Sequence, residues 1–234
     1  MPNEYMPEIA HNIKHLRERI AHVAGACGRQ ASDVTLLAVS KTQPAAAIRA
    51  AHAAGLRAFG ENYVQEALGK IAELADCAIA WHFIGPIQSN KTRPLAEQFA
   101  WVHSIDRLKI ATRLSEQRPP GMAALNVCIQ VNIDDEASKA GVAPGDVAAL
   151  AAAIAELPNL RLRGLMAIPA PEADIEKQRA PFFRLRQLLD TLKAAPALRH
   201  LDTLSMGMSA DLEAAISEGA TIIRVGTAIF GERQ

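Results

Sequence analysis

The chain has 234 residues, with 25 Lys or Arg against 25 Asp or Glu, so its formal net charge is zero. Half of the residues are apolar and only 4% are aromatic, a composition that can bury a large aliphatic core and excludes a globally disordered chain. Zero net charge argues against a broad basic face for nucleic acid or for an anionic membrane, but it allows a local site for one small anion.

The cellular compartment can be inferred from apolar runs and cysteines. Charged side chains recur through the first 20 residues, and no apolar run approaches the roughly 18 residues of a membrane-spanning helix. Cys27, Cys77 and Cys128 are odd in number and far apart, which fits a reducing cytosol better than a disulfide framework. The sequence contains no CxxC or HExxH spacing, so we expect no metal site. We expect a cytoplasmic protein with a single domain, residues 1–234.

Residues 3–27 predict an amphipathic helix, because apolar side chains recur there at steps of three and four. Those side chains are Ile9, Ile13, Leu16, Ile20 and Val23. Beyond this helix, short β-branched runs alternate with helical patterns.

Eight runs have the composition of strands: Val34–Ser40, Ala58–Gly60, Ala80–Ile84, Trp101–Ile105, Asn126–Val131, Leu162–Ile168, Thr203–Ser205 and Thr221–Val225. Seven helical patterns lie between or after them: Ala45–Ala54, Val64–Leu74, Leu95–Phe99, Leu108–Glu116, Val147–Glu156, Glu176–Ala194 and Ala210–Glu218. Such alternation predicts parallel βαβ units, with the N-terminal helix as the eighth helix. Eight units in about 200–250 residues predict an α/β fold of the (β/α)8 TIM-barrel type; an open doubly wound sheet is the alternative.

Lys41 is the first candidate functional residue. It comes two residues after the apolar run Leu36–Val39, at the end of a barrel strand where the chemistry of this fold is found. Apolar surroundings can lower the pKa of a lysine amine, which can then attack a carbonyl group and form a Schiff base. A solvated lysine that merely ends a strand is the alternative.

The sequences after the last two strands suit a phosphate group. Arg224–Thr227 contains Gly226, and glycine lets the backbone approach an anion in the loops where this fold usually binds phosphate. Ser209 precedes the helix expected over Ala210–Glu218, so its hydroxyl can either cap that helix or hold phosphate. Together with Lys41, these loops suggest a phosphorylated aldehyde: pyridoxal phosphate (PLP), or the sugar phosphate of an aldolase.

Five sequence blocks carry a resemblance to a known family: Val39–Thr42, Phe59–Glu66, Trp81–Lys91, Leu204–Ser209 and Arg224–Gly231. They resemble the pyridoxal phosphate homeostasis proteins, also called the YggS or PROSC family. The resemblance runs in order from about residue 10 to the C-terminus.

This resemblance implies a barrel similar to the N-terminal domain of alanine racemase, with Lys41 holding PLP as a Schiff base. It implies that Ser209, Gly226 and Thr227 bind the phosphate. It also implies that Arg224 points at the pyridine nitrogen.

Two further positions follow from the same resemblance. Asn62 lies in the block after the second strand and is expected near the cofactor. Lys139, within Asp135–Gly141, matches another family block; it either influences cofactor exchange or is a solvated loop lysine.

The resemblance implies a role without catalysis. An arginine at the pyridine nitrogen stays charged and cannot accept a hydrogen bond from a protonated ring. Racemisation needs acid–base groups on both faces of the substrate carbon, and in alanine racemase the second group comes from an additional domain of a partner subunit. Because this chain ends at Gln234, shortly after the eighth strand, we expect no such domain.

We therefore expect a monomeric PLP-binding protein, with no catalytic residue, that buffers PLP and supplies it to apo-enzymes. Two alternatives remain at this point. The first is an enzyme, either an amino-acid racemase or a Schiff-base aldolase, and the second is an interaction protein in which Lys41 has no special role.

Overall fold

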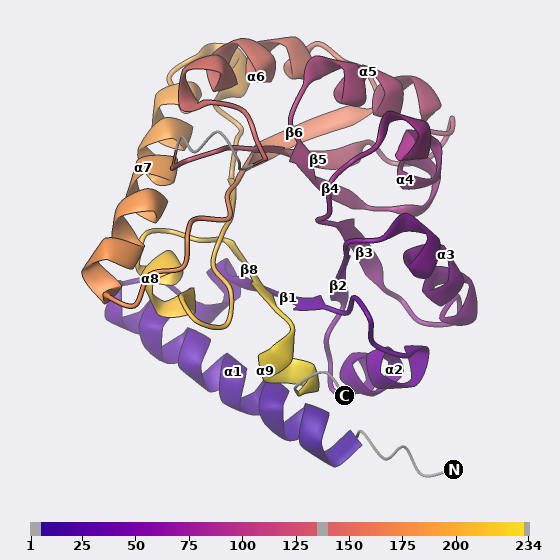
Figure 1. Ribbon diagram of the computed structural model, residues 1–234, viewed down its shortest axis with the longest axis vertical. Coiled ribbons are helices and arrows are strands. Elements are labelled where there is room, and N and C mark those ends of the chain that lie inside the picture. The colour runs from indigo at the N-terminus through magenta and orange to yellow at the C-terminus, as the bar shows by residue number, and fades with distance from the viewer. Residues whose placement is uncertain (1–5, 135–139, 232–234) are drawn as a thin grey trace.

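The computed structural model describes residues 6–134 and 140–231, and its eight strands form one closed parallel barrel (Figure 1). The strands are β1 (Thr35–Val39), β2 (Ala58–Glu61), β3 (Ala80–Phe83), β4 (Trp101–Ile105), β5 (Leu125–Gln130), β6 (Leu160–Met166), β7 (Thr203–Ser205) and β8 (Ile222–Val225). Each strand pairs with the next in the sequence, and β8 pairs with β1. The predicted (β/α)8 barrel is confirmed, and the open sheet is wrong.

Helices surround this barrel in the order of the chain. They are α1 (Met6–Ala26), α2 (Ala45–Ala53), α3 (Val64–Glu73), α4 (Thr92–Gln98), α5 (Leu108–Gln117), α6 (Val147–Ala155), α7 (Ile175–Lys193), α8 (Leu212–Ser217) and α9 (Thr227–Phe230). Short 3-10 turns occupy η1 (Ala31–Asp33), η2 (Ser89–Lys91), η3 (Pro144–Asp146) and η4 (Pro196–Leu198).

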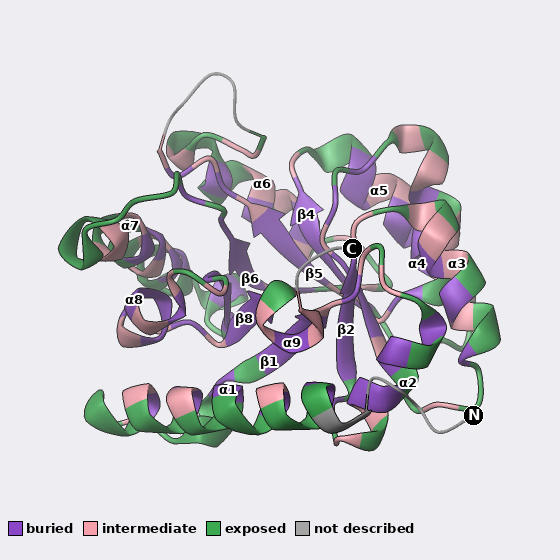
Figure 2. Ribbon diagram, turned by 60° about the horizontal axis from the view of Figure 1, so that its bottom comes forward, coloured by how far each residue is buried: buried purple, intermediate pink, exposed green. Residues whose placement is uncertain are grey.

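The N-terminal helix α1 completes the ring of helices, as predicted. It lies against α2, α8 and α9, with its apolar face turned inward and its polar face exposed (Figures 1 and 2). Arg19 of α1 donates a 2.5 Å hydrogen bond to Glu213 of α8, and Asn12 donates to the carbonyl of Ile229 in α9. These contacts join the start of the chain to its last two helices.

Most expected helix boundaries in the described residues lie within one residue of the structure, but two helix starts were wrong by two residues or more. Helix α4 begins at Thr92 rather than Leu95, because Pro94 lies in its first turn, where a missing N–H breaks no helical hydrogen bond. Helix α8 begins at Leu212 rather than Ala210, with Asp211 at the capping position. Ser209 is therefore not the cap of this helix.

The barrel interior is a small compartment, separate from the main core between strands and helices. Leu37, Ala58 and Ile222 form its apolar part, and Ile84 and Trp101 pack against them. All five belong to strands or strand ends, so their side chains meet across the barrel and fill it, as is usual for this fold.

A chain of polar side chains fills the rest of the interior. Arg224 Nη1 donates to Ser205 Oγ at 2.8 Å, Ser205 Oγ lies 2.7 Å from His103 Nδ1, and His103 Nε2 lies 2.9 Å from His82 Nδ1. The ring of His82 stacks on Trp101. A serine hydroxyl that accepts from Arg224 can donate to His103, which in turn can donate to His82, so neutral rings satisfy the whole chain.

These histidines predict a loss of stability on acidification. Burial lowers the pKa of His82 to about 3 and that of His103 well below its ordinary value of 6.5. The unfolded chain protonates both rings as the pH falls through about 6.5, whereas the folded protein keeps them neutral, so the free energy of unfolding decreases below that pH. Each ring contributes up to about 1.4 kcal/mol per pH unit. Urea denaturation between about pH 7 and pH 5 measures this slope.

The variant His82→Asn serves as the control for that measurement. It removes one of the two titrating rings and leaves a polar atom near the position of Nδ1. We expect the slope to fall to about half, since one ring remains. An unchanged slope would show that acidification acts through other groups.

Candidate functional site

The carboxyl ends of β1 and β8 lie side by side, because Ala38 pairs with Val225 in the parallel register. A cavity of about 330 Å³ opens there, within the roughly 300–1,000 Å³ typical of small-molecule sites. All six expected site residues line it: Lys41, Asn62, Ser209, Arg224, Gly226 and Thr227. They come from four places in the sequence, which only the closed barrel brings together.

Lys41 sits in a tight turn at the end of β1. The amide of Gln43 donates to the carbonyl of Ser40, and the amide of Ser40 donates to Gly60 at the end of β2. Thr42 adopts a φ of 65°, a left-handed conformation that is a genuine outlier for a β-branched residue. Such strain costs about 1–3 kcal/mol and persists only where surrounding contacts impose it.

Arg224 forms the floor of the cavity and is almost fully buried. Its Nη1 donates to Ser205 and its Nη2 to the carbonyl of Ala167. Burial lowers the pKa of Arg224 to about 10, and the nearby Asp211 carboxylate partly opposes this effect. The guanidinium therefore remains charged at neutral pH and offers a ligand only hydrogen-bond donors.

One wall of the cavity suits an anion. Ser209 contributes a hydroxyl, and Thr227 begins α9, whose first amide groups have no acceptor within the helix. A Cβ on Gly226 would lie 3.2 Å from the carbonyl oxygen of Val39, so only glycine fits there without displacing β1. These donors and this narrow approach fit a phosphate group.

Asn62 adds a hydrogen-bond acceptor to the donors of the cavity. Its Oδ1 is buried and has no hydrogen-bond partner among the residues that the structure describes. The backbone of Asn62 packs closely against Gly85, just beyond β3, since a Cβ on Gly85 would lie 2.2 Å from the Asn62 carbonyl oxygen. An acceptor in this position is available to a ligand that carries a hydroxyl donor. The cavity therefore offers an amine, anion-binding donors and one acceptor, as a phosphorylated, hydroxylated aldehyde requires.

Three charged residues behind Lys41 were not among the expected site residues. Glu61 ends β2, while Glu66 and Lys70 lie one turn apart on α3. Lys70 Nζ lies 2.9 Å from Glu61 Oε1 and 2.5 Å from Glu66 Oε1. The spacing of Glu66 and Lys70 is that of an ordinary helical ion pair, so only the buried position of Glu61 could have drawn attention to them.

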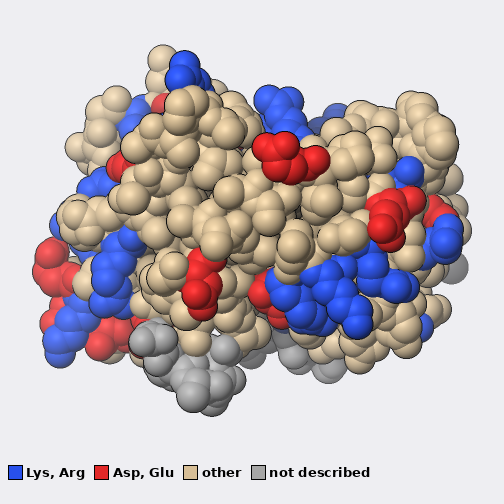
Figure 3. All heavy atoms as spheres, turned by 90° about the horizontal axis from the view of Figure 1, so that it is seen from above, with Lys and Arg blue, Asp and Glu red and all other residues tan. Residues whose placement is uncertain are grey.

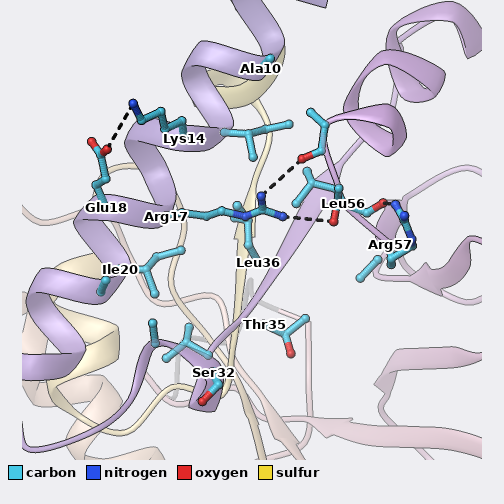
Figure 4. Close-up of a pocket in the computed structure, with 17 residues that line it drawn as sticks. Ala10, Lys14, Arg17, Glu18, Ile20, Ser32, Thr35, Leu36, Leu56 and Arg57 are labelled. Carbon is cyan, nitrogen blue, oxygen red and sulfur yellow. Dashed lines mark hydrogen bonds and ion pairs between the residues drawn. The ribbon is translucent and has the colours of Figure 1, made fainter.

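A larger cavity lies at the opposite end of the barrel. It has a volume of about 810 Å³ and lies between α1 and the amino ends of β1 and β2 (Figure 4). Arg17 reaches across it and donates to the carbonyls of Ala54 and Gly55. Its lining is mostly aliphatic and contains none of the six expected site residues. This cavity is the larger of the two. The smaller one is nevertheless the candidate ligand site, because it contains the reactive and anion-binding groups.

Several other expectations can be compared with the structure. Residues 6–134 and 140–231 contain no group of three or more His, Cys, Asp or Glu side chains that could hold a metal ion. Within the same ranges, no helix has the length and apolar composition needed to cross a membrane. Lys139 lies outside the described residues.

The surface carries charges of both signs. On the face shown in Figure 3, acidic and basic groups are interspersed over a mostly uncharged surface, and some of the basic groups form one compact cluster.

Comparisons with known proteins agree with this geometry. Residues 6–234 match the alanine racemase N-terminal domain family. The chain is 66% identical over 228 residues to the pyridoxal phosphate homeostasis protein of Pseudomonas aeruginosa, with 97% of each chain covered.

Solved structures give the same result. PipY of Synechococcus elongatus, determined with PLP bound, superposes with a TM-score of 0.83 at 40% identity, covering 95% of this chain and 100% of that one. Alanine racemase from Corynebacterium glutamicum has a TM-score of 0.70 at 18% identity, covering 97% of this chain and 62% of that one, which shows a shared fold alone. The chain therefore belongs to the pyridoxal phosphate homeostasis protein family and has the alanine racemase N-terminal barrel.

Proposed function

We propose that this protein binds PLP reversibly in the cavity at Lys41 and serves intracellular PLP homeostasis. One observation carries this proposal. Lys41, Arg224 and the anion-binding wall of Ser209, Gly226 and Thr227 line the same cavity. The PLP-bound structure of PipY and the names of the curated relatives support it. Residues 1–234 would act as one PLP-binding domain.

Lys41 is proposed to hold the cofactor covalently. Its amine would add to the aldehyde carbon, so that a C=N bond forms and the aldehyde oxygen leaves as water. Addition of water reverses the step and releases the aldehyde. A reversible bond suits a carrier, since a free aldehyde would otherwise condense with any exposed amine.

The other cavity residues are proposed to orient the cofactor. Ser209, Gly226 and Thr227 hold the phosphate, which places the aldehyde near Lys41. Asn62 accepts a hydrogen bond from the ring hydroxyl, and this contact would satisfy its buried oxygen.

Arg224 is proposed to face the pyridine nitrogen. PLP, when bound, supplies an electron sink that is strongest when this nitrogen is protonated. Because Arg224 is charged at neutral pH and only donates hydrogen bonds, it favours the unprotonated nitrogen. The cavity thereby binds PLP while weakening its reactivity.

We infer a cytoplasmic carrier without catalytic turnover, which acts as a monomer and delivers PLP to apo-enzymes. A PLP-dependent amino-acid racemase is the alternative. The closed barrel, which has the fold of alanine racemase, supports this alternative. The names of the curated relatives, which refer to homeostasis, support the carrier.

Removal of the Lys41 amine tests the covalent site. Wild-type protein mixed with PLP should develop a visible absorbance band and bind about one equivalent of cofactor. Lys41→Ala should show no band, because no other lysine in residues 6–134 and 140–231 lines the cavity. Lys91→Ala is the matched control, since Lys91 lines a neighbouring cavity and not this one, and it should keep the band. A band that survives in Lys41→Ala would refute the assignment.

The phosphate wall is tested with two ligands. Ser209→Ala should lower the affinity for PLP by about tenfold, the loss expected for one charge-assisted hydrogen bond. Its affinity for pyridoxal, which lacks the phosphate, should stay within about twofold of wild type. Isothermal titration of both ligands measures this contrast, and equal losses for both would show that Ser209 does not act on the phosphate.

Turnover distinguishes the carrier from the racemase. With saturating PLP and L-alanine, we expect racemisation well below about 1 s⁻¹, whereas ordinary enzymes turn over at roughly 1–1,000 s⁻¹. Chiral chromatography of the product measures this rate. Turnover above about 1 s⁻¹ would establish the racemase and contradict the carrier.

A further inference from the structure

Behind Lys41 lies a cluster of charges that the proposed cofactor contacts do not use. It consists of Glu61, Glu66 and Lys70, here called the α3 cluster. Lys70 bridges the two carboxylates, at 2.9 Å from Glu61 Oε1 and 2.5 Å from Glu66 Oε1. Figure 1 shows that α3 lies outside β2 and β3.

The α3 cluster binds the backbone on both sides of Lys41. Lys70 Nζ donates to the carbonyl of Ser40 at 2.7 Å, and the amide of Thr42 donates to Glu66 Oε1 at 2.5 Å. The hydroxyl of Ser40 donates to Glu61 at 2.6 Å. Both neighbours of the lysine are therefore held, while its own side chain is directed into the cavity.

Two of the three side chains in the α3 cluster are buried, and that of Glu66 is 30% exposed. The side chain of Glu61 is fully buried and that of Lys70 is only 8% exposed, so each charge depends on the other for compensation. Burial raises the pKa of Glu61, and the contacts with Ser40 and Lys70 oppose this rise. Buried paired charges have few alternative positions, which makes them suitable anchors for a turn.

Thr42 shows that this turn needs an anchor. Its φ of 65° is unfavourable for threonine, and in this turn its N–H donates to Glu66. Without Glu66, the turn is free to relax toward ordinary backbone angles. The Cα of Lys41 would then move, and so would the base of its side chain.

We propose that Glu66 and Lys70 position Lys41 for its reaction with the cofactor aldehyde by holding the peptide groups before and after it. This inference rests on the proposed function. Neither side chain lines the cavity, so both are positioning residues rather than cofactor ligands.

Two ligands separate the positioning of Lys41 from cofactor binding in general. PLP can form the C=N bond, whereas pyridoxine 5′-phosphate has the same ring and phosphate but an alcohol in place of the aldehyde. A misplaced Lys41 lowers the affinity for PLP alone. The affinity for pyridoxine 5′-phosphate stays the same, because phosphate binding depends on other loops. Comparing the two ligands therefore isolates the position of the amine.

The first variant is Glu66→Ala, which removes the acceptor of the Thr42 amide. We expect its affinity for PLP to fall by about tenfold, the loss of a charge-assisted hydrogen bond, and its affinity for pyridoxine 5′-phosphate to stay within about twofold of wild type. The circular dichroism of the visible band, measured per bound PLP, should also fall, because the bound lysine is less fixed.

A conservative variant and a control complete the series. Glu66→Gln keeps an acceptor oxygen at the same reach and should recover much of the PLP affinity and of the dichroism. Glu73→Ala removes an exposed carboxylate from the same helix, away from the turn, and should behave as wild type. Thermal unfolding of each variant shows that it is folded. Should Glu66→Ala not fold, Glu66→Ser, which is too short to accept from the Thr42 amide, takes its place in the same comparison of PLP with pyridoxine 5′-phosphate.

Two outcomes would overturn the inference. Glu66→Ala with unchanged PLP affinity and dichroism would show that the turn holds itself. Equal losses for both ligands would show a general effect on the cavity. If wild type itself forms no C=N bond at Lys41, the proposed function fails instead, and that result is distinct from both.

Discussion

The pairing of β1 with β8 is the constraint on which the site depends. These strands are separated by most of the sequence, yet their hydrogen bonds run from Thr35 opposite Ile222 to Ala38 opposite Val225. Because the strands are parallel, the residues after both emerge at the same rim. Lys41 and Gly226 thereby line one cavity, and a shift in this register would separate the amine from the anion-binding wall.

The interior of the barrel then determines what the cavity can do. Arg224 is buried and charged, and its hydrogen bonds to Ser205 and Ala167 hold it in place. Neutral histidines continue this chain of polar groups, since the burial of a charged ring would be costly. These hydrogen bonds offset the free-energy cost of burying the Arg224 guanidinium, and they also fix its orientation. The floor of the cavity is therefore a preoriented hydrogen-bond donor.

Much of the fold could be predicted from the sequence, because its elements are short and their patterns local. The apolar face of α1 and the strands β4 and β7 have the expected positions, and the six expected site residues meet in one cavity. Local patterns failed where a boundary depended on the wider structure. Ser209 has the sequence context of a helix cap, but the helix begins beyond it at Leu212.

The α3 cluster could not be predicted for a different reason. Glu66 and Lys70 are spaced like any exposed helical ion pair, and no sequence pattern shows that they reach the backbone beside Lys41. Their contacts depend on how α3 lies against the end of β1, which is a property of the assembled barrel. Backbone contacts of this kind are invisible in a sequence because the acceptor or donor is the same in every residue.

The central claim is that the Lys41 amine carries the cofactor. It is tested most directly by reducing the PLP-loaded protein with borohydride, which converts a reversible C=N bond into a stable amine, and by mapping the labelled peptide with mass spectrometry. The account predicts a single pyridoxyl group, on Lys41. A label on another lysine, or no label after reduction, would contradict it.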